Sequence, residues 1–308
     1  MPLLQSDAMK RLKERAEKAD RYLQNIENKS HLLPVRHPQQ DFFIADIFDS
    51  PSMKDDIASM EHPLFALKAG DCRPRKYEHN GITIEIRPAV QIGMATIHDK
   101  DIWIYCISKM MAALNKGELI NRTVRFTAYD FLVTTNRRTD GDSYERMKDS
   151  LDRLRGTTVT TNIETATRRE ARGFGLIDSW HIIEKEEETQ RMIAIEVTLP
   201  DWLYRSVQDK AVLSISPNYF RLRKPLDRRI YELARKHCGK QRSWSISIEL
   251  LHKKTGSTAP FRNFKIAMKS LVESNDLPDY KLEYDTEKNI IIFKNIYSFI
   301  PKKLKTGK

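Results

Sequence analysis

Apolar positions along the chain follow two spacings, one of three or four residues and one of two. The first spacing is typical of amphipathic helices and the second of half-buried strands. From about residue 98 onward, an order of helix, strand, helix, turn, helix and hairpin occurs twice. In the first copy we predict helices at 99–115, 128–134 and 143–155, a strand at 122–126, and β-rich segments at 157–163, 175–184 and 191–199. Asp99 and Thr127 are the expected N-caps of the first two helices.

The second copy begins after Ser216. We predict helices at 226–238, 248–255 and 261–274, a short strand at 244–247, and a wing of two strands at 280–285 and 289–294. The order in each copy is that of a winged helix-turn-helix. The predicted fold class is therefore α+β, with two tandem winged helix-turn-helix domains and an N-terminal helical arm.

The chain before the first copy contains three further signals. Residues 6–28 carry apolar residues at the alternating spacing of a short coiled-coil seam, which packs either on its own domain or on a partner. Pro34 and Pro38 favour an extended linker. Asn80-Gly81, followed by alternating isoleucines, indicates a hairpin. The predicted domains are an arm and linker at 1–40, a first winged-helix domain with its preceding hairpin at 41–216, a second winged-helix domain at 217–300, and a basic tail at 301–308.

Composition narrows the class of protein. The 308 residues are 40% hydrophobic and 31% charged, which supports packed cores and excludes a wholly disordered chain. No apolar run approaches the roughly 18 residues of a membrane span, and the first 20 residues lack a signal-peptide core, so we expect a cytoplasmic protein without a membrane partner. Cys72, Cys106 and Cys238 are scattered, which predicts reduced thiols and no metal site.

The net charge of +11 is concentrated in one region. Residues 217–308 hold 21 Lys/Arg and 9 Asp/Glu, whereas residues 1–97 hold 14 of each and residues 98–216 hold 18 and 19. Such a one-sided excess favours a polyanionic partner, above all nucleic acid. An anionic membrane surface and a simple role in solubility are the alternatives.

The helix at 261–274 is the best candidate for reading DNA sequence. Phe261, Phe264, Met268 and Leu271 form its apolar face, and its other face carries Arg262, Asn263, Lys265, Ile266 and Lys269. The third helix of a helix-turn-helix lies in the major groove with its N-terminal residues at base edges. Arginine suits guanine and asparagine suits adenine, so Arg262 and Asn263 are the expected base readers.

Other cations are candidates for contacts with phosphates, which supply affinity but no sequence reading. In the second domain these are Arg221, Arg223, Lys224, Arg228 and Arg229, some of which are expected to pair structurally. In the first domain, Arg137 and Arg138 lie before the third helix, and Arg168 and Arg169 lie between the wing segments. Arg146, Ser150 and Arg153, on the third helix itself, are candidate DNA contacts of that helix. Acidic residues are interspersed on that third helix, which leaves open whether this domain mainly binds DNA or dimerises.

A short peptide after the proline linker is a candidate partner site. Gln39, Asp41, Phe42 and Phe43 resemble the motif that docks bacterial proteins on the replicative sliding clamp. Two adjacent aromatic residues after an extended arm suit a hydrophobic pocket. The alternative is that both phenylalanines anchor the arm on the first domain.

The sequence contains no recognisable catalytic motif. No phosphate-binding loop occurs, which disfavours an ATP-driven helicase or initiator and predicts no cofactor. His237 and His252 are followed three residues later by Lys240 and Thr255, not by the arginine of a tyrosine recombinase. We therefore expect a DNA-binding protein and not an enzyme. A transcriptional repressor, a nuclease or recombinase, and an interaction scaffold are the rival interpretations.

Several segments together resemble the plasmid replication initiator proteins of the RepA type, which are related to TrfA. The matching segments lie at 41–48, 59–65, 95–101, 122–128, 173–180, 219–239 and 250–257, of which 219–239 is the longest. The resemblance implies tandem winged-helix domains that bind direct repeats, called iterons, in the duplex DNA of a plasmid origin.

The resemblance also implies how such a protein acts. It implies opening of the adjacent AT-rich duplex, with the resulting single-stranded DNA as a further candidate partner, and recruitment of the host replicative helicase. It implies copy control through dimers that repress and monomers that initiate, with the first winged helix as the dimerising domain. The DNA-contact role then belongs to the third helix of each domain.

Overall fold

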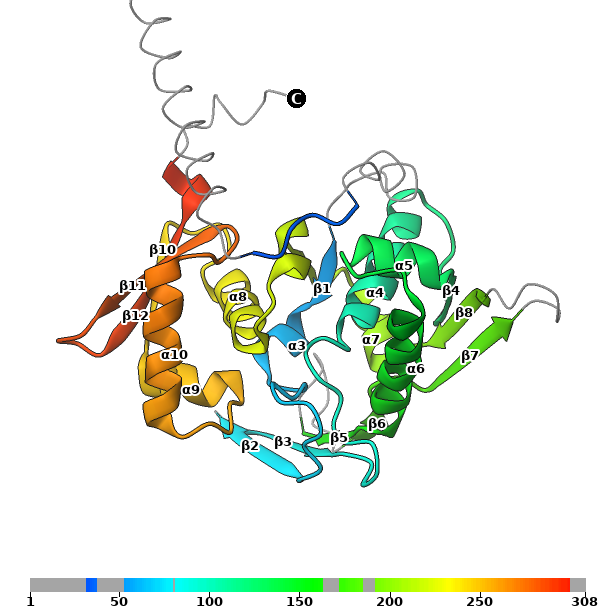
Figure 1. The fold of residues 1–308 in the computed structure, drawn as a ribbon, viewed down its shortest axis with the longest axis horizontal. Coiled ribbons are helices and arrows are strands. Elements are labelled where there is room, and N and C mark those ends of the chain that lie inside the picture. The colour runs from blue at the N-terminus through cyan, green and yellow to red at the C-terminus, as the bar shows by residue number, and fades with distance from the viewer. Residues whose placement is uncertain (1–31, 38–52, 80, 163–171, 185–191, 300–308) are drawn as a thin grey trace, which may run out of the picture.

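The computed structural model describes residues 32–37, 53–79, 81–162, 172–184 and 192–299 (Figure 1). The arm helix predicted at 6–28 and the basic tail at 301–308 lie outside these residues. Within the described chain, the first winged helix lies on the right of Figure 1 and the second on the left. The first helix of the second winged helix, α8 (Pro225–His237), lies toward the centre of the view beside α3 (Ile57–Glu61).

The first winged helix forms from the elements that periodicity predicts. Its helices are α4 (Asp101–Asn115), α5 (Ala128–Thr134) and α6 (Gly141–Gly156). Its sheet contains β4 (Thr123–Phe126), β7 (Ser179–Glu184) and β8 (Met192–Thr198) in the order β4-β8-β7. The side chain of Thr127 accepts a hydrogen bond from the backbone of Asp130, and Asp140 accepts one from Ser143, so both α5 and α6 begin at capping residues.

Two sequence-based expectations for this domain are wrong. The segment expected at 157–163 does not join the wing: β5 (Thr158–Thr161) pairs instead with β3 (Ile82–Arg87) and β6 (Arg172–Gly175) in a sheet completed by β2 (Arg75–His79). Val159 lies opposite Ile86 in this register, and both are buried, so core packing selects the hairpin as the partner.

Asp99 is not the N-cap of α4, which begins two residues later with Lys100 in the cap position. The Asp99 carboxylate instead accepts hydrogen bonds from the backbone of Thr96, at 2.8 Å, and from Arg153. A long-range ion pair has therefore taken the place of the local capping interaction that the sequence predicts.

The second winged helix follows its prediction closely. After α8 come β10 (Ser243–Ser247), α9 (Ile248–Thr255), α10 (Phe261–Ser274), β11 (Tyr280–Asp285) and β12 (Ile290–Asn295), with strand order β10-β12-β11. Ser247 caps α9 by accepting from the backbone of Leu250. Gly256 ends that helix with φ of 68°, a left-handed conformation that favours glycine.

Some elements have no counterpart in the prediction. They are β1 (Lys54–Asp56), α3, α7 (Asp201–Gln208), β9 (Val212–Ser214) and the short 3₁₀ helices η2 (Pro217–Arg221) and η3 (Ile296–Phe299). β1 pairs with β9 in antiparallel fashion, and α3 packs against α8. Of these elements, β1 packs against α4 of the first winged helix and α3 against α8, so β1 and α3 connect the two winged helices.

A buried cluster of charges lies where the two winged helices meet. Lys100 Nζ lies 2.8 Å from Asp55 Oδ2 and 3.0 Å from Glu232 Oε1, and all three side chains are at most 1% exposed. Burial raises the pKa of Asp55 to about 7, against the opposing effect of Lys100. Because Lys100 comes from the first winged helix and Glu232 from α8, the two share one interior.

The described residues add three further findings. Cys72, Cys106 and Cys238 are all free, as expected from their spacing. Among the described residues, no group of His, Cys, Asp or Glu has the arrangement of a metal site. No helix in the described part of the chain has the length and apolar character needed to span a membrane.

Candidate nucleic-acid interface

Helix α10 presents the face that the sequence predicts. Phe264, Met268 and Leu271 are at most 2% exposed and pack on the core. On the opposite side, the side chains of Arg262, Asn263, Ile266 and Lys269 are exposed, and Ile266 is an unusually exposed apolar residue at 59%. Among the described residues, no carboxylate pairs with Arg262 or Lys269. Both cations are therefore available to an external partner.

Lys265 differs from its neighbours on α10. Its side chain is half-buried, its Nζ lies 3.4 Å from Oδ1 of Asn289 before β12, and it lies 5.5 Å from the ring centre of Phe261. Lys265 therefore links α10 to the wing and is less available than Arg262 for contact with a base.

The third helix of the first winged helix, α6, presents a weaker basic face. Arg146 is exposed, but Lys148 lies 3.7 Å from Glu145, and Asp149 and Asp152 are exposed on the same helix. The mixture of signs predicted for α6 is thus present on its surface. An anionic duplex gains less from such a face than from α10.

Ser150 of α6 is buried and Arg153 is already paired with a carboxylate, which corrects their assignment as DNA contacts. Ser150 is 3% exposed, and its Oγ donates to the carbonyl of Arg146 at 2.8 Å. Arg153 donates to both carboxylate oxygens of Asp99, from Nε at 2.8 Å and from Nη2 at 2.9 Å. Both side chains support the helix from within the domain.

Arg228 and Arg229 are also misassigned, because both are buried in α8 at 4% and 3% exposure. Arg228 donates to Asp101 at 2.6 Å and to the carbonyls of Leu222 and Phe220. Arg229 pairs with Glu232 at 3.0 Å and donates to four backbone carbonyls, three of them in α3. Both guanidinium groups thus already have partners within the protein, and they link α8 to elements that precede it in the chain.

The remaining candidates in the described chain differ in their exposure and in whether other groups of the protein already bind their side chains. Arg223 and Lys224 are exposed, and Arg138 is exposed with Asp140 at 2.7 Å. Arg221 and Arg137 are half-buried: Arg221 donates to Leu33 and Asn218, and Arg137 to His98 and Asp101. The other predicted site residues, Arg168, Arg169, Gln39, Asp41, Phe42 and Phe43, lie outside the described residues.

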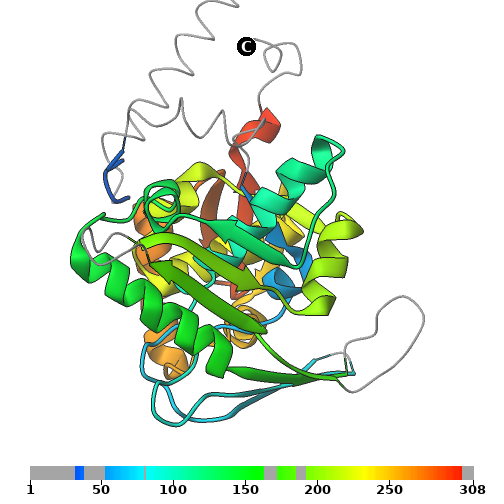
Figure 2. The ribbon, with the colours of Figure 1, turned by 90° about the vertical axis from the view of Figure 1, so that its right-hand side faces the viewer.

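Helices α6 and α10 lie on the same face of the molecule. Both lie at the front of the molecule in Figure 1 and on the left in Figure 2, whereas α7 lies on the right in Figure 2. A duplex that crosses this face could meet both helices.

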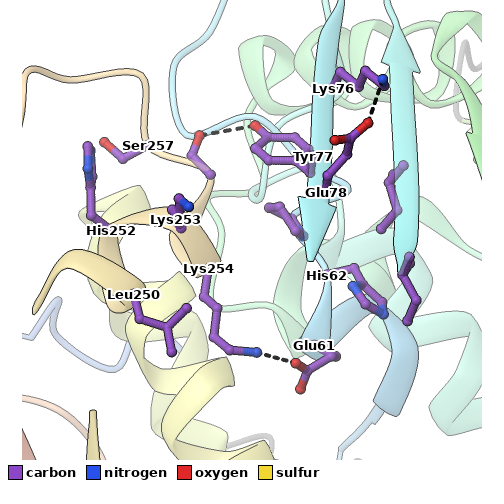
Figure 3. A pocket seen from close by; sticks show the side chains of 14 residues that line it. Glu61, His62, Lys76, Tyr77, Glu78, Leu250, His252, Lys253, Lys254 and Ser257 are labelled. Atoms are coloured by element: carbon purple, nitrogen blue, oxygen red, sulfur yellow. Dashed lines mark hydrogen bonds and ion pairs between the residues drawn. The ribbon is translucent and has the colours of Figure 1, made fainter. Parts of the chain in front are cut away.

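A pocket of about 300 Å³ lies between the β2–β3 hairpin and α9 (Figure 3). On its rim, Tyr77 donates to the carbonyl of Gly256 at 3.3 Å, and Lys254 pairs with Glu61. Burial alone would raise the pKa of Glu61, but hydrogen bonds from His237 and Lys254 hold it well below its usual range.

The hairpin side and α9 also approach each other closely at Gly256, where a Cβ would lie 2.6 Å from Cβ of Pro63. These contacts fasten the hairpin to the second winged helix and leave few charges unpaired.

Known proteins are similar to this chain, one in sequence and others in fold. A protein of Wigglesworthia glossinidia brevipalpis named "Putative replication protein" is 45% identical over 271 residues, which cover 87% of this chain and 98% of the relative. Two crystal structures of RctB domains 2 and 3 match with TM-scores of 0.55 and 0.51 at 11% identity, covering 76% and 78% of this chain and 94% and 96% of theirs.

The similarity in structure supports the tandem winged-helix, α+β fold predicted from the sequence. A weaker match, with a TM-score of 0.45 and 12% identity over 65% of this chain and 90% of the other, is to the Pi initiator protein in complex with iteron DNA. The family model described as "Replication initiator protein A" matches residues 54–282. This protein belongs to the replication initiator protein A family.

Proposed function

We propose that this replication initiator binds repeated sequences in the duplex of a plasmid origin, promotes opening of that origin and recruits host replication proteins. The observation that carries the proposal is the exposed face of α10, with Arg262, Asn263 and Lys269 in the position of a recognition helix. The surrounding third of the chain supplies the excess positive charge. Membership of a replication initiator family supports an origin as the target.

The chemistry of this face suits recognition in the major groove. Arg262 and Asn263 lie in the first turn of α10, where side chains of a recognition helix reach base edges. A bidentate arginine favours guanine, a bidentate asparagine favours adenine, and exposed Ile266 suits a thymine methyl group. Lys269, two turns along, is suited to a phosphate. The proposed site therefore combines base readers with a cation that supplies affinity.

Two recognition helices on one face suggest how bound protein strains DNA. Contacts in two successive major grooves would extend over roughly 20 base pairs. Bending a site of that length costs on the order of 1–6 kcal/mol, which an array of bound molecules would concentrate beside the repeats. The proposed role needs no catalytic step: binding energy supplies the distortion, and the helicase recruited from the host supplies the unwinding.

The partners in this proposal extend beyond duplex DNA. We include single-stranded DNA of the opened origin, the host helicase, and a second copy of the chain in a monomer–dimer equilibrium. The sliding clamp is a further proposed partner through Gln39, Asp41, Phe42 and Phe43. A peptide-binding measurement with clamp and a Phe42→Ala, Phe43→Ala variant tests that contact.

Footprinting and a melting assay on a supercoiled origin plasmid test the function. Protection of spaced repeats together with reactivity of the neighbouring AT-rich strand to a single-strand probe is the expected result. Repeat protection without such reactivity would indicate a transcriptional repressor. Nicking of the plasmid would indicate a nuclease or recombinase, and equal binding to origin and random duplex would overturn sequence-specific recognition.

A further inference from the structure

A second pocket, of about 360 Å³, lies where the two winged helices meet. We call it the junction pocket. Its lining includes six arginines, drawn from the segment before β1, the α5–α6 turn, α6, the loop after η2, and α8: Arg36, Arg137, Arg138, Arg146, Arg223 and Arg228. Among the described residues that line it, none is Asp or Glu.

The positive charge of the junction pocket is only partly neutralised. Buried Asp101 lies 2.8 Å from Nη2 of Arg137 and 2.6 Å from Nη1 of Arg228, and Asp140 pairs with Arg138. Within the described part of the chain, the side chains of Arg36, Arg146 and Arg223 have no ion-pair partner. Burial, reinforced by Arg228, lowers the pKa of His98 to about 4, so this lining histidine is neutral at pH 7. Arginines therefore supply the net charge.

Residues 32–37, which we call the strap, hold the pocket together. Leu33 exchanges hydrogen bonds with Arg221 of the second winged helix, at 3.0 Å and 2.6 Å. The backbone of Arg36 donates to Oδ1 of Asn136 in the first winged helix at 2.8 Å, and Asn136 donates back to Pro34 at 3.1 Å. The strap thus spans both domains and sets Arg36 at the pocket.

The three unpaired guanidinium groups favour an oxyanion as the ligand, and the arginine fork matches phosphate oxygens in bidentate geometry. The pocket borders the face that carries α6 and α10: Arg146 is on α6 itself, and the strap lies on the same side of the molecule in both views (Figures 1 and 2). Between two successive major grooves, a duplex presents its sugar–phosphate backbone to a protein on that face.

We propose that the junction pocket binds one phosphodiester group of the origin duplex, between the stretches that contact α6 and α10. The assignment rests on the proposed function, since it requires that both helices engage one duplex. It adds a contact whose ligands come from both winged helices and the strap. Binding at this point therefore fixes the spacing of the two recognition helices on DNA as well as adding affinity.

The salt dependence of binding to origin duplex tests the pocket in the full chain. Arg36→Ala and Arg223→Ala remove exposed arginines that lie outside both recognition helices. Because the pocket binds one phosphate, the two substitutions together should reduce the slope of log affinity against log salt by about 0.9, which is a roughly threefold smaller loss between 50 and 200 mM salt, and each alone should reduce it by less. Arg205→Ala on α7 is the matched control, because Arg205 is exposed, pairs with Asp201 one turn away, and belongs to a helix that lies on the opposite side of the molecule from α6 in Figure 2. Thermal unfolding checks that all three variants fold.

A scan with uncharged methylphosphonates, placed one at a time along the origin duplex, locates the phosphate. In the wild type, one position between the two contacted grooves should weaken binding, and in Arg36→Ala, Arg223→Ala protein that same substitution should have little further effect. Equal penalties in wild type and variant at every position would overturn the proposal. Failure of the wild type to prefer origin over random duplex would instead refute the proposed function, so the two failures are distinguishable.

Inorganic phosphate, titrated into the full chain without DNA, tests a free anion as the source of the ligand. We expect millimolar phosphate to bind weakly and to compete with the origin duplex in a manner that depends on Arg36 and Arg223. Tight phosphate binding that depends on these arginines but leaves DNA affinity unchanged would assign the pocket to a free anion and overturn the assignment to the duplex.

Discussion

Helices α6 and α10 occupy the same place in two copies of one architecture, yet they use their charges differently. On α10, Arg262 and Lys269 are exposed and unpaired among the described residues. On α6, Arg153 is held by Asp99, and Lys148 lies near Glu145. The position of a residue in a winged helix therefore does not by itself assign it to DNA. What decides is whether a carboxylate of the protein has already satisfied the cation.

Arginines within the second winged helix also differ in whether a carboxylate of the protein already pairs with them. Arg223 is exposed, whereas Arg228, five residues later, is buried against Asp101. Substitutions that remove a satisfied cation should change folding, and those that remove an unsatisfied one should change DNA binding. Four substitutions test this division, from the largest expected effect to the smallest.

Arg228→Ala should lower the free energy of unfolding by about 3–5 kcal/mol, because it leaves two buried carbonyls without their donor and removes a partner of buried Asp101. Urea unfolding measures the loss. Exposed Arg223→Ala should stay within about 0.5 kcal/mol of the wild type. A stable Arg228→Ala protein with only a reduced salt slope would restore the original assignment of Arg228 as a phosphate contact.

Arg153→Ala should cost about 3 kcal/mol of stability, at the low end for a buried pair because Arg153 is 23% exposed while Asp99 is 3% exposed. Arg146→Ala, on the same helix, should leave the unfolding curve unchanged and weaken duplex binding at low salt. If the two variants lost equal affinity with no change in stability, α6 would use its cations as α10 does.

Arg262→Ala should leave stability unchanged and weaken binding to the origin by about 1–3 kcal/mol, with relaxed preference at one base position. Competition binding against a panel of single-base variants measures this effect. The exposed Arg205→Ala protein again serves as the control. Equal weakening on origin and random duplex would show that Arg262 contacts a phosphate and does not read a base.

The smallest expected effect is the change in protein stability with pH that His98 causes. Its folded pKa of about 4 lies below the unfolded value of 6.5, so stability is complete above pH 6.5 and falls as pH drops toward 4. His98→Gln removes this dependence, so its free energy of unfolding at pH 4.5 should exceed that of the wild type by about 1–2 kcal/mol. Urea unfolding as a function of pH measures this gain. The effect concerns the junction between the winged helices, not the face of α10.

Local pattern was sufficient to predict most elements, as α9 and α10 illustrate. Ser247 and Gly256 mark the ends of α9, and the apolar spacing of Phe264, Met268 and Leu271 defines the buried side of α10. Periodicity depends only on residues within a few turns, so these signals do not depend on contacts with the rest of the chain.

Local periodicity could not predict contacts between residues that are far apart in the sequence. The partner of Arg228 is 127 positions away, and β5 pairs with a hairpin that precedes it by more than 70 residues. One sequence signal for α8 was present: Ile230, Tyr231, Leu233 and Ala234 are apolar and nearly consecutive, which is typical of a largely buried helix, and the structure buries all four. Arg36 was missed because its position depends on the strap contacting both domains.

The buried cluster of Lys100, Asp55 and Glu232 bears on how such a protein changes its origin. An exchange of the second winged helix between two related proteins would separate Glu232 from Lys100 and Asp55, and a recipient without a matching carboxylate would hold a buried ammonium with half its counter-charge. Exchange of a whole domain by recombination should therefore destabilise the recipient protein. New origin preference arises with less disruption by single substitutions on the exposed side of α10, where no buried charge depends on the outcome.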